Sequence, residues 1–109
     1  MAATFKNFRA LMTTGGATAY TCPALTTAKI LHCQVANVDG VNSADATVHW
    51  TDDSNSDAVT RLGLTVVVPA QTSISMLTGT LILEAGDTLV GIASADSDLE
   101  LSGSVLEMS

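Results

Sequence analysis

The first residues that could do chemistry are five carboxylates within residues 83–102, LEAGDTLVGIASADSDLELS. Paired carboxylates are the usual equipment of acid–base catalysis. Here the segment 84–87 has the composition of a tight turn, and Asp96 and Asp98 fall in the next predicted turn. Glu100 alternates with apolar neighbours and is expected on the solvent face of a strand. We therefore interpret these acids as turn formers and surface charges and expect no catalytic dyad.

A second acidic stretch, DDSNSD at residues 52–57, partly matches a calcium-binding loop. Alternate residues from Asp53 onward supply oxygen ligands at the first, third and fifth loop positions. The match then fails, because the sixth position is Ala58 instead of glycine and the twelfth is Leu64 instead of glutamate. The sequence favours a solvated hairpin loop, and a weak ion site completed by other loops is the alternative.

The two histidines, His32 and His49, each lie on the polar phase of a predicted strand. Neither has a nucleophile in an ordered motif, since the sequence contains no G-x-S-x-G elbow and no glycine-rich phosphate loop. A small hydrolase is therefore the weakest of the functions considered. We expect that the protein is not an enzyme and that it has no catalytic residues, no metal and no cofactor.

The two cysteines, Cys22 and Cys33, are not spaced with the histidines as in a zinc finger. No apolar stretch follows the N-terminal Lys6 and Arg9, so no secretory signal is expected and the protein should be made in the cytosol. Thiols stay reduced there. Two small buried side chains are the favoured interpretation, and a disulfide between neighbouring strands is the alternative.

Charge is unevenly distributed along this chain of 109 residues and net charge −7. Residues 1–16 carry two cations and no acid, whereas the remainder carries two cations and eleven acids, a net of −9. Such an acidic body would be repelled by the phosphates of nucleic acid. No apolar run approaches the ~20 residues of a membrane span. We expect neither nucleic acid nor a membrane as a partner.

Val, Ile, Leu, Ala and Thr dominate the composition, which is typical of strands. The length corresponds to one domain. Short alternating runs are separated by turn residues about every ten positions, and this pattern predicts an all-β fold: a single β-sandwich, jelly-roll-like, with about seven or eight short antiparallel strands. The expected strands cover residues 17–22, 28–38, 46–51, 58–69, 79–84, 88–95 and 98–108.

Strict alternation also predicts which side chains face inward. In residues 28–38 it places Leu31 with Cys33 on one face and Ile30 with His32 on the other. Trp50 is in phase with its apolar neighbours, so we expect a core anchor, and the alternative is that Trp50 or Tyr20 is exposed for stacking on a sugar. The predicted core comprises Cys33, Val35, Val48, Trp50, Leu64, Val66, Leu81, Leu83, Leu99 and Leu101.

The N-terminal segment, residues 1–16, is expected to be an arm attached to a sandwich domain of residues 17–109. Its apolar spacing fits a short helix or an extended chain, and both remain open. The arm could fold back on its own sandwich, or it could bind another subunit, because aromatic residues and Arg dominate interface energies. The predicted partner contacts are Phe5, Lys6, Phe8, Arg9 and Met12.

Three stretches give the chain a resemblance to a known group of proteins: FKNFRALMTTGGATAYTCPA near the start, QVANVDG with VHWTDDSNSDAVTRL in the middle, and LEAGDTLVGIASADSDLELSGSVLEMS at the end. In style and motif order the chain resembles small all-β structural proteins of tailed bacteriophages. Among these it looks most like the decoration or cement proteins of the head. Small β-domains of necks, tails and baseplates share the same texture.

The resemblance implies a non-enzymatic virion protein, made in the host cytoplasm, that binds the outer surface of the head. Its implied partners are the major capsid protein and other copies of itself, as a homo-oligomer and most often a trimer, which together would reinforce the capsid. An acidic body and exposed strand edges are compatible with that role. Several weak contacts on a fixed lattice would also act together. The alternative is a tail, neck or baseplate module that binds carbohydrate or a receptor.

Overall fold

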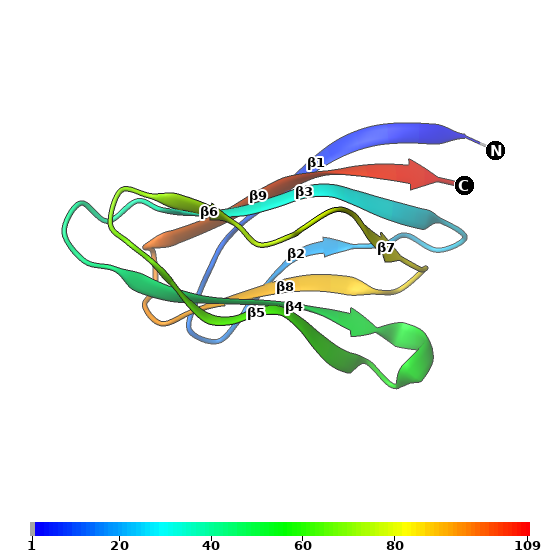
Figure 1. The fold of residues 1–109 in the computed structure, drawn as a ribbon. Coiled ribbons are helices and arrows are strands. Elements are labelled where there is room, and N and C mark those ends of the chain that lie inside the picture. Colours follow the sequence, from blue (N-terminus) through cyan, green and yellow to red (C-terminus); the bar gives the residue numbers. More distant parts are fainter. Residues whose placement is uncertain (1) are drawn as a thin grey trace.

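Two antiparallel sheets lie face to face in the computed structural model, which describes residues 2–109 (Figure 1). Sheet A has the strand order β1-β9-β3-β6, and β7 pairs with a different part of β3 from β6; sheet B has the order β2-β8-β4-β5. The elements are β1 (Ala3–Leu11), β2 (Ala17–Thr21), β3 (Thr27–Asn37), β4 (Ala44–Asp52), the 3-10 turn η1 (Asp53–Asn55), β5 (Ala58–Val68), β6 (Ser73–Ser75), β7 (Leu81–Leu83), β8 (Thr88–Ala93) and β9 (Leu99–Met108).

The strand order is that of a jelly roll, in which the chain passes repeatedly from one sheet to the other. Among residues 2–109 consecutive strands share a sheet only twice: β4 and β5 form a hairpin, and β6 and β7 both pair with β3. The predicted all-β sandwich is confirmed. Residues 2–109 form nine strands instead of seven or eight, because β6 and β7 are separate and because the N-terminal segment also forms a strand.

The N-terminal segment is part of the sandwich, which revises the expected boundary at residue 16. Strand β1 pairs with β9 over its whole length, from Ala3 opposite Met108 to Leu11 opposite Glu100. Phe8 and Met12 lie in the core. Side chains alternate between the two faces of a strand. Phe8 and Met12 are an even number of residues apart and both face inward, whereas Phe5 is an odd number of residues from Phe8, faces outward and is 74% exposed.

Most of the predicted core is confirmed. Trp50 and Leu81 are partly buried and pack against the central cluster. Fully burying one aliphatic side chain contributes roughly 1.5–3 kcal/mol to the free energy of unfolding, so the stability of the sandwich depends on the contacts between its two sheets. The fully buried members of the prediction are Cys33, Val35, Val48, Leu83, Leu99 and Leu101.

The prediction of a core position is wrong for two residues, Leu64 and Val66. Leu64 is 61% exposed and Val66 also lies on the surface. The β4–β5 register shifts between Ala46 and Val48, where β5 has one more residue than β4, and Thr65 adopts a positive φ of 47°. This β-bulge disrupts the alternation that the sequence pattern assumed. β5 is also an edge strand, so the second sheet does not cover its side chains fully.

Strand β3 contains a second irregularity that the sequence pattern missed. Its register with β9 shifts between Ile30 and His32, so Ile30 faces the core while Leu31 and His32 both lie on the surface. Gly103 of β9 sits beside this bulge. A Cβ atom at Gly103 would lie within 3 Å of both the Phe8 ring and the His32 carbonyl oxygen. Only glycine therefore fits between β1 and the bulge of β3.

Candidate functional site

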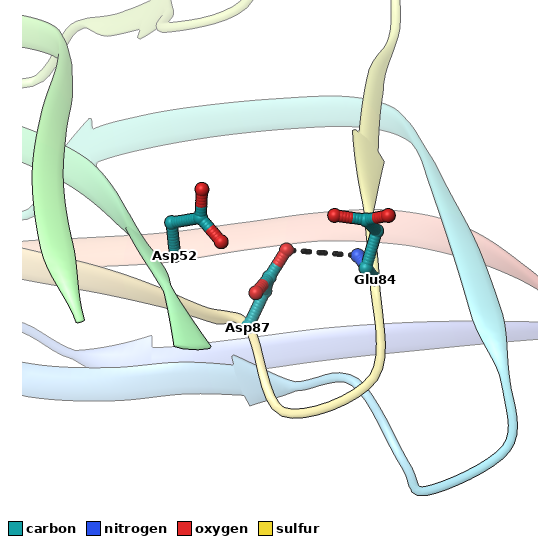
Figure 2. A group of neighbouring side chains, drawn as sticks. All are labelled: Asp52, Glu84 and Asp87. Atoms are coloured by element: carbon teal, nitrogen blue, oxygen red, sulfur yellow. Dashed lines mark hydrogen bonds between the residues drawn. The ribbon is translucent and has the colours of Figure 1, made fainter. Parts of the chain in front are cut away.

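Three carboxylates, one from the end of β4 and two from the β7–β8 turn, meet at the end of the sandwich that carries η1 (Figure 2). Asp52 ends β4, Glu84 follows β7 and Asp87 precedes β8. One oxygen from each lies within 4.8 Å of the others, a spacing that could hold a cation. Among residues 2–109 no other group of three acids, histidines or cysteines comes together in this way.

Hydrogen bonds within the protein account for the buried member of this cluster. Asp87 is 2% exposed, and its two oxygens accept from the backbone nitrogens of Asp53 (2.9 Å) and Glu84 (2.8 Å). The second of these bonds is visible in Figure 2. Asp52 accepts from the backbone nitrogen of Ser54 and so caps η1. The cluster is a brace between two turns, and the sequence did not predict that Asp52 would join the 84–87 turn.

The histidines and cysteines do not form a reactive group. His32 lies on the outer face of sheet A and His49 on sheet B, where burial, with a smaller effect from Arg61, lowers the pKa of His49. Within residues 2–109 no hydrogen bond joins either histidine to a serine or a carboxylate. Cys22 and Cys33 are both free and buried, as the favoured interpretation expected, and burial raises the pKa of Cys33 to about 11.

The two aromatic side chains considered for sugar stacking are engaged elsewhere. Trp50 packs against the core. Tyr20 lies against Phe8, with ring centroids 5.9 Å apart, and its hydroxyl donates to Glu107 at 2.5 Å. Glu107 also forms an ion pair with Lys6 at 2.9 Å. These contacts connect β2 of sheet B with β9 and β1 of sheet A, so Tyr20 helps to hold the two sheets together.

The structure divides the five predicted partner contacts. Phe8 and Met12 are buried in the chain's own core, which removes them from any contact surface. Phe5 and Arg9 are exposed on the outer face of sheet A. Lys6 is bound to Glu107, although about half of its side chain stays exposed.

Strand β5 forms an apolar edge that the sequence analysis placed partly in the core. It pairs with β4 alone, so the backbone groups along its other edge have no strand partner. Four of its side chains are large, apolar and exposed, and Arg61 is its one charged residue. A long edge with a single charged residue is unusual on a monomer, because such edges pair with other chains. The exposed residues are Val59, Leu64, Val66 and Val67.

A polar trough crosses the outer face of sheet A, on the side of the molecule away from sheet B. Its floor is β9, where serines stand between longer side chains of β1 and β3. The hollow has a volume of about 550 Å³ and continues toward Phe5 and Leu31. We call this the sheet A trough; its outward polar side chains are Asn7, Arg9, His32, Gln34, Ser102 and Ser104.

The signal for the trough was present in the sequence but was not recognised. The run Ser102-Gly103-Ser104 in a central strand leaves space that larger residues would fill. The bulge that aims Leu31 and His32 outward could not be read from alternation alone. No helix among residues 2–109 has the length and apolar character needed to cross a membrane.

Comparisons with known proteins define the fold. No family model matches the sequence, and no curated protein matches it. A chain from the study "Bacillus endospore appendages form a novel family of disulfide-linked pili" is similar, with a TM-score of 0.58 and 12% identity over 99% of this chain and 87% of that one. A chain from the acidic stable capsid of Helicobacter pylori bacteriophage KHP30 has a TM-score of 0.58 and 9% identity over 98% and 87%.

A third structure, of infectious bursal disease virus strain Gx, matches with a TM-score of 0.50 and 13% identity over 97% of this chain and 30% of that chain. Identities this low show the shared fold alone. The chain is therefore a small jelly-roll β-sandwich, and chains with a similar fold occur in structures of a bacterial appendage and of two viruses.

Proposed function

We propose that this chain is a non-enzymatic structural protein of a phage virion, which decorates the outer surface of the head and bridges major capsid subunits. The observation that carries the proposal is the apolar edge of β5. The similarity in fold between this chain and a chain from a phage capsid structure supports the proposal.

The β5 edge has the composition of a contact surface. Its exposed valines and Leu64 would be costly to leave in water, and each Å² of apolar surface that a partner covers contributes roughly 25 cal/mol. The free backbone groups of the edge can pair with a strand of another subunit. Lys and other charged residues usually protect such edges, and β5 has only Arg61. We infer that this edge is covered in the assembled protein.

The charge of the chain suits the outside of a head. A net charge of −7 disfavours contact with packaged DNA and keeps the chain soluble before assembly. A homo-oligomer, most simply a trimer, would place several copies of the same surface over the capsid lattice. Several weak contacts made together then bind far more tightly than one.

Light scattering coupled to size exclusion tests the self-association. A trimer near three times 11.2 kDa is expected for the intact chain, and the double variant Leu64→Lys/Val67→Lys should be a monomer with an unchanged circular dichroism spectrum. Thr18→Lys, an exposed substitution on β2, is the matched control and should remain a trimer. An association that survives the double variant would contradict the role of β5.

Cosedimentation tests the location on the virion. The chain should bind phage heads that lack it and raise the temperature at which they release DNA. The alternative, a tail, neck or baseplate module, predicts binding to purified tails and none to heads.

A further inference from the structure

We propose that the sheet A trough is a binding site for an acidic oligosaccharide, that is, a sugar chain carrying a carboxylate. This inference does not depend on the proposed function, because the trough lies on sheet A and the β5 edge belongs to sheet B. In Figure 1 β1, β9 and β3 lie together in one layer and β4 and β5 in the other, so assembly through β5 leaves the trough open.

The shape of the trough is built into the backbone. Ser102 and Ser104 project from the middle strand, and their small side chains make a floor between β1 and β3. The β3 bulge turns His32 outward onto one wall of the trough. At position 103 of β9, glycine is the one residue type that leaves room for that bulge. Bulges of this kind often re-aim a side chain next to a functional site.

The polar side chains of the trough have no partners within the protein. None of the six forms a side-chain hydrogen bond or an ion pair with another group among residues 2–109, although many other polar side chains do. The amides of Asn7 and Gln34 each offer a donor and an acceptor side by side, and serine hydroxyls do both. Sugar hydroxyls also donate and accept, so this set matches a polyhydroxylated ligand better than an apolar one.

The charge on the outer face of sheet A favours an acidic sugar over a neutral one. On this face β1, β9 and β3 present two cations, Arg9 and Lys29, against one carboxylate, Glu100, although the chain as a whole is at −7. An arginine guanidinium binds a carboxylate through two parallel hydrogen bonds. Arg9 stands on the wall of the trough, where it can meet the carboxylate of a bound sugar.

An exposed aromatic ring lies at the far end. Phe5, two residues from Asn7 on the same face, is 74% exposed and lines the continuation of the trough with Leu31 and Ser104. The ring can stack against the C–H face of a sugar. An acidic peptide would find the same cation but no deep apolar pocket to anchor a side chain, so the lining favours a sugar.

Calorimetric titration of the intact chain tests the site with four probes: 3′-sialyllactose and tetragalacturonate as acidic sugars, lactose as a neutral sugar, and hexaglutamate as an acidic peptide. We expect at least one acidic sugar to bind and lactose and the peptide to bind much more weakly. Arg9→Ala should weaken binding by about tenfold or more, since it removes the hydrogen bonds between the guanidinium and the sugar carboxylate. Phe5→Ala should weaken it by a smaller factor.

A filling variant separates the trough from the rest of the surface. Ser104→Leu puts apolar bulk on the floor without entering the core and should abolish binding. Thr18→Leu adds similar bulk to β2 in the other sheet and should bind as the wild type does. Leu64→Lys/Val67→Lys should lose association and keep sugar binding, so the two proposals can fail separately. Binding by Ser104→Leu at wild-type strength, equal binding of lactose, preference for the peptide, or no binding of either acidic sugar would overturn the inference.

Discussion

At the scale of single residues, Asp87 shows how one buried carboxylate joins two turns. Each of its oxygens accepts from a backbone nitrogen, one in η1 and one in the β7–β8 turn. In sequence Asp87 looks like an ordinary turn residue, because Asp53 lies far away along the chain. Its burial converts a local turn preference into a tertiary contact.

We predict that Asp87→Asn lowers the free energy of unfolding by about 1–3 kcal/mol, because the amide nitrogen cannot accept and leaves a buried donor without a partner. Urea unfolding measures the change. Asp57→Asn is the control: Asp57 lies in the same region, is exposed and is expected to change stability little. Equal effects at the two positions would contradict the brace.

A second residue-scale prediction concerns Tyr20 and Glu107. The hydrogen bond from the Tyr20 hydroxyl, followed by Lys6, holds the pKa of Glu107 below its ordinary value, and burial, followed by Glu107, raises the pKa of Tyr20. A carboxylate whose pKa is lower in the folded state stabilises the fold above its unfolded pKa, and this contribution is lost as the pH falls through the folded pKa.

Tyr20→Phe should therefore make the unfolding free energy less dependent on pH between about pH 5 and pH 3 than it is in the wild type. The phenylalanine ring keeps the contact with Phe8, so packing serves as an internal control. Urea unfolding at a series of pH values gives the slope. A slope that does not change would show that the hydrogen bond does not perturb Glu107.

At the scale of elements, the edge position of β5 decides the fate of Leu64. We predict that Leu64→Ala changes the unfolding free energy of the monomer by about 0.5 kcal/mol or less, whereas Leu83→Ala, at a fully buried position, costs about 2–5 kcal/mol. Both variants remove the same atoms, so they form a matched pair for thermal or urea unfolding. A large loss at Leu64 would restore the core position that alternation assigned to it.

Strands could be predicted from this sequence wherever alternation runs without a bulge. Val35, Val48 and Leu99 were placed correctly because their neighbours keep the period of two. Prediction failed where the backbone gains a residue, at Leu31 in β3 and at Leu64 in β5, since a bulge depends on contacts with the partner strand. The sheet A trough could not be predicted for the same reason, because the bulge in β3 turns His32 onto its wall.

At the scale of the whole molecule, the two ends of the chain lie side by side. The backbone nitrogen of Ala2 donates to the carbonyl oxygen of Ser109 at 2.8 Å, and the nitrogen of Ser109 donates back to Ala2 at 2.9 Å. Strands β1 and β9 are the first and last strands of residues 2–109 and pair over nine residues. Pairings so distant in sequence make folding slow, because the loop must close before the contacts form.

This topology predicts that residues 2–11 cannot be removed as a detachable arm. Their deletion would expose the edge of β9 and remove Phe8 from the core, where truncation of an aromatic residue alone costs about 3–5 kcal/mol. A domain of this size has a total stability of about 5–15 kcal/mol, so the shortened chain should be largely unfolded by circular dichroism and exchange its amide protons rapidly. Phe5→Ser in the full chain, an exposed change on the same strand, should keep the fold. A cooperative unfolding transition in the shortened chain would show instead that residues 12–109 form a domain on their own.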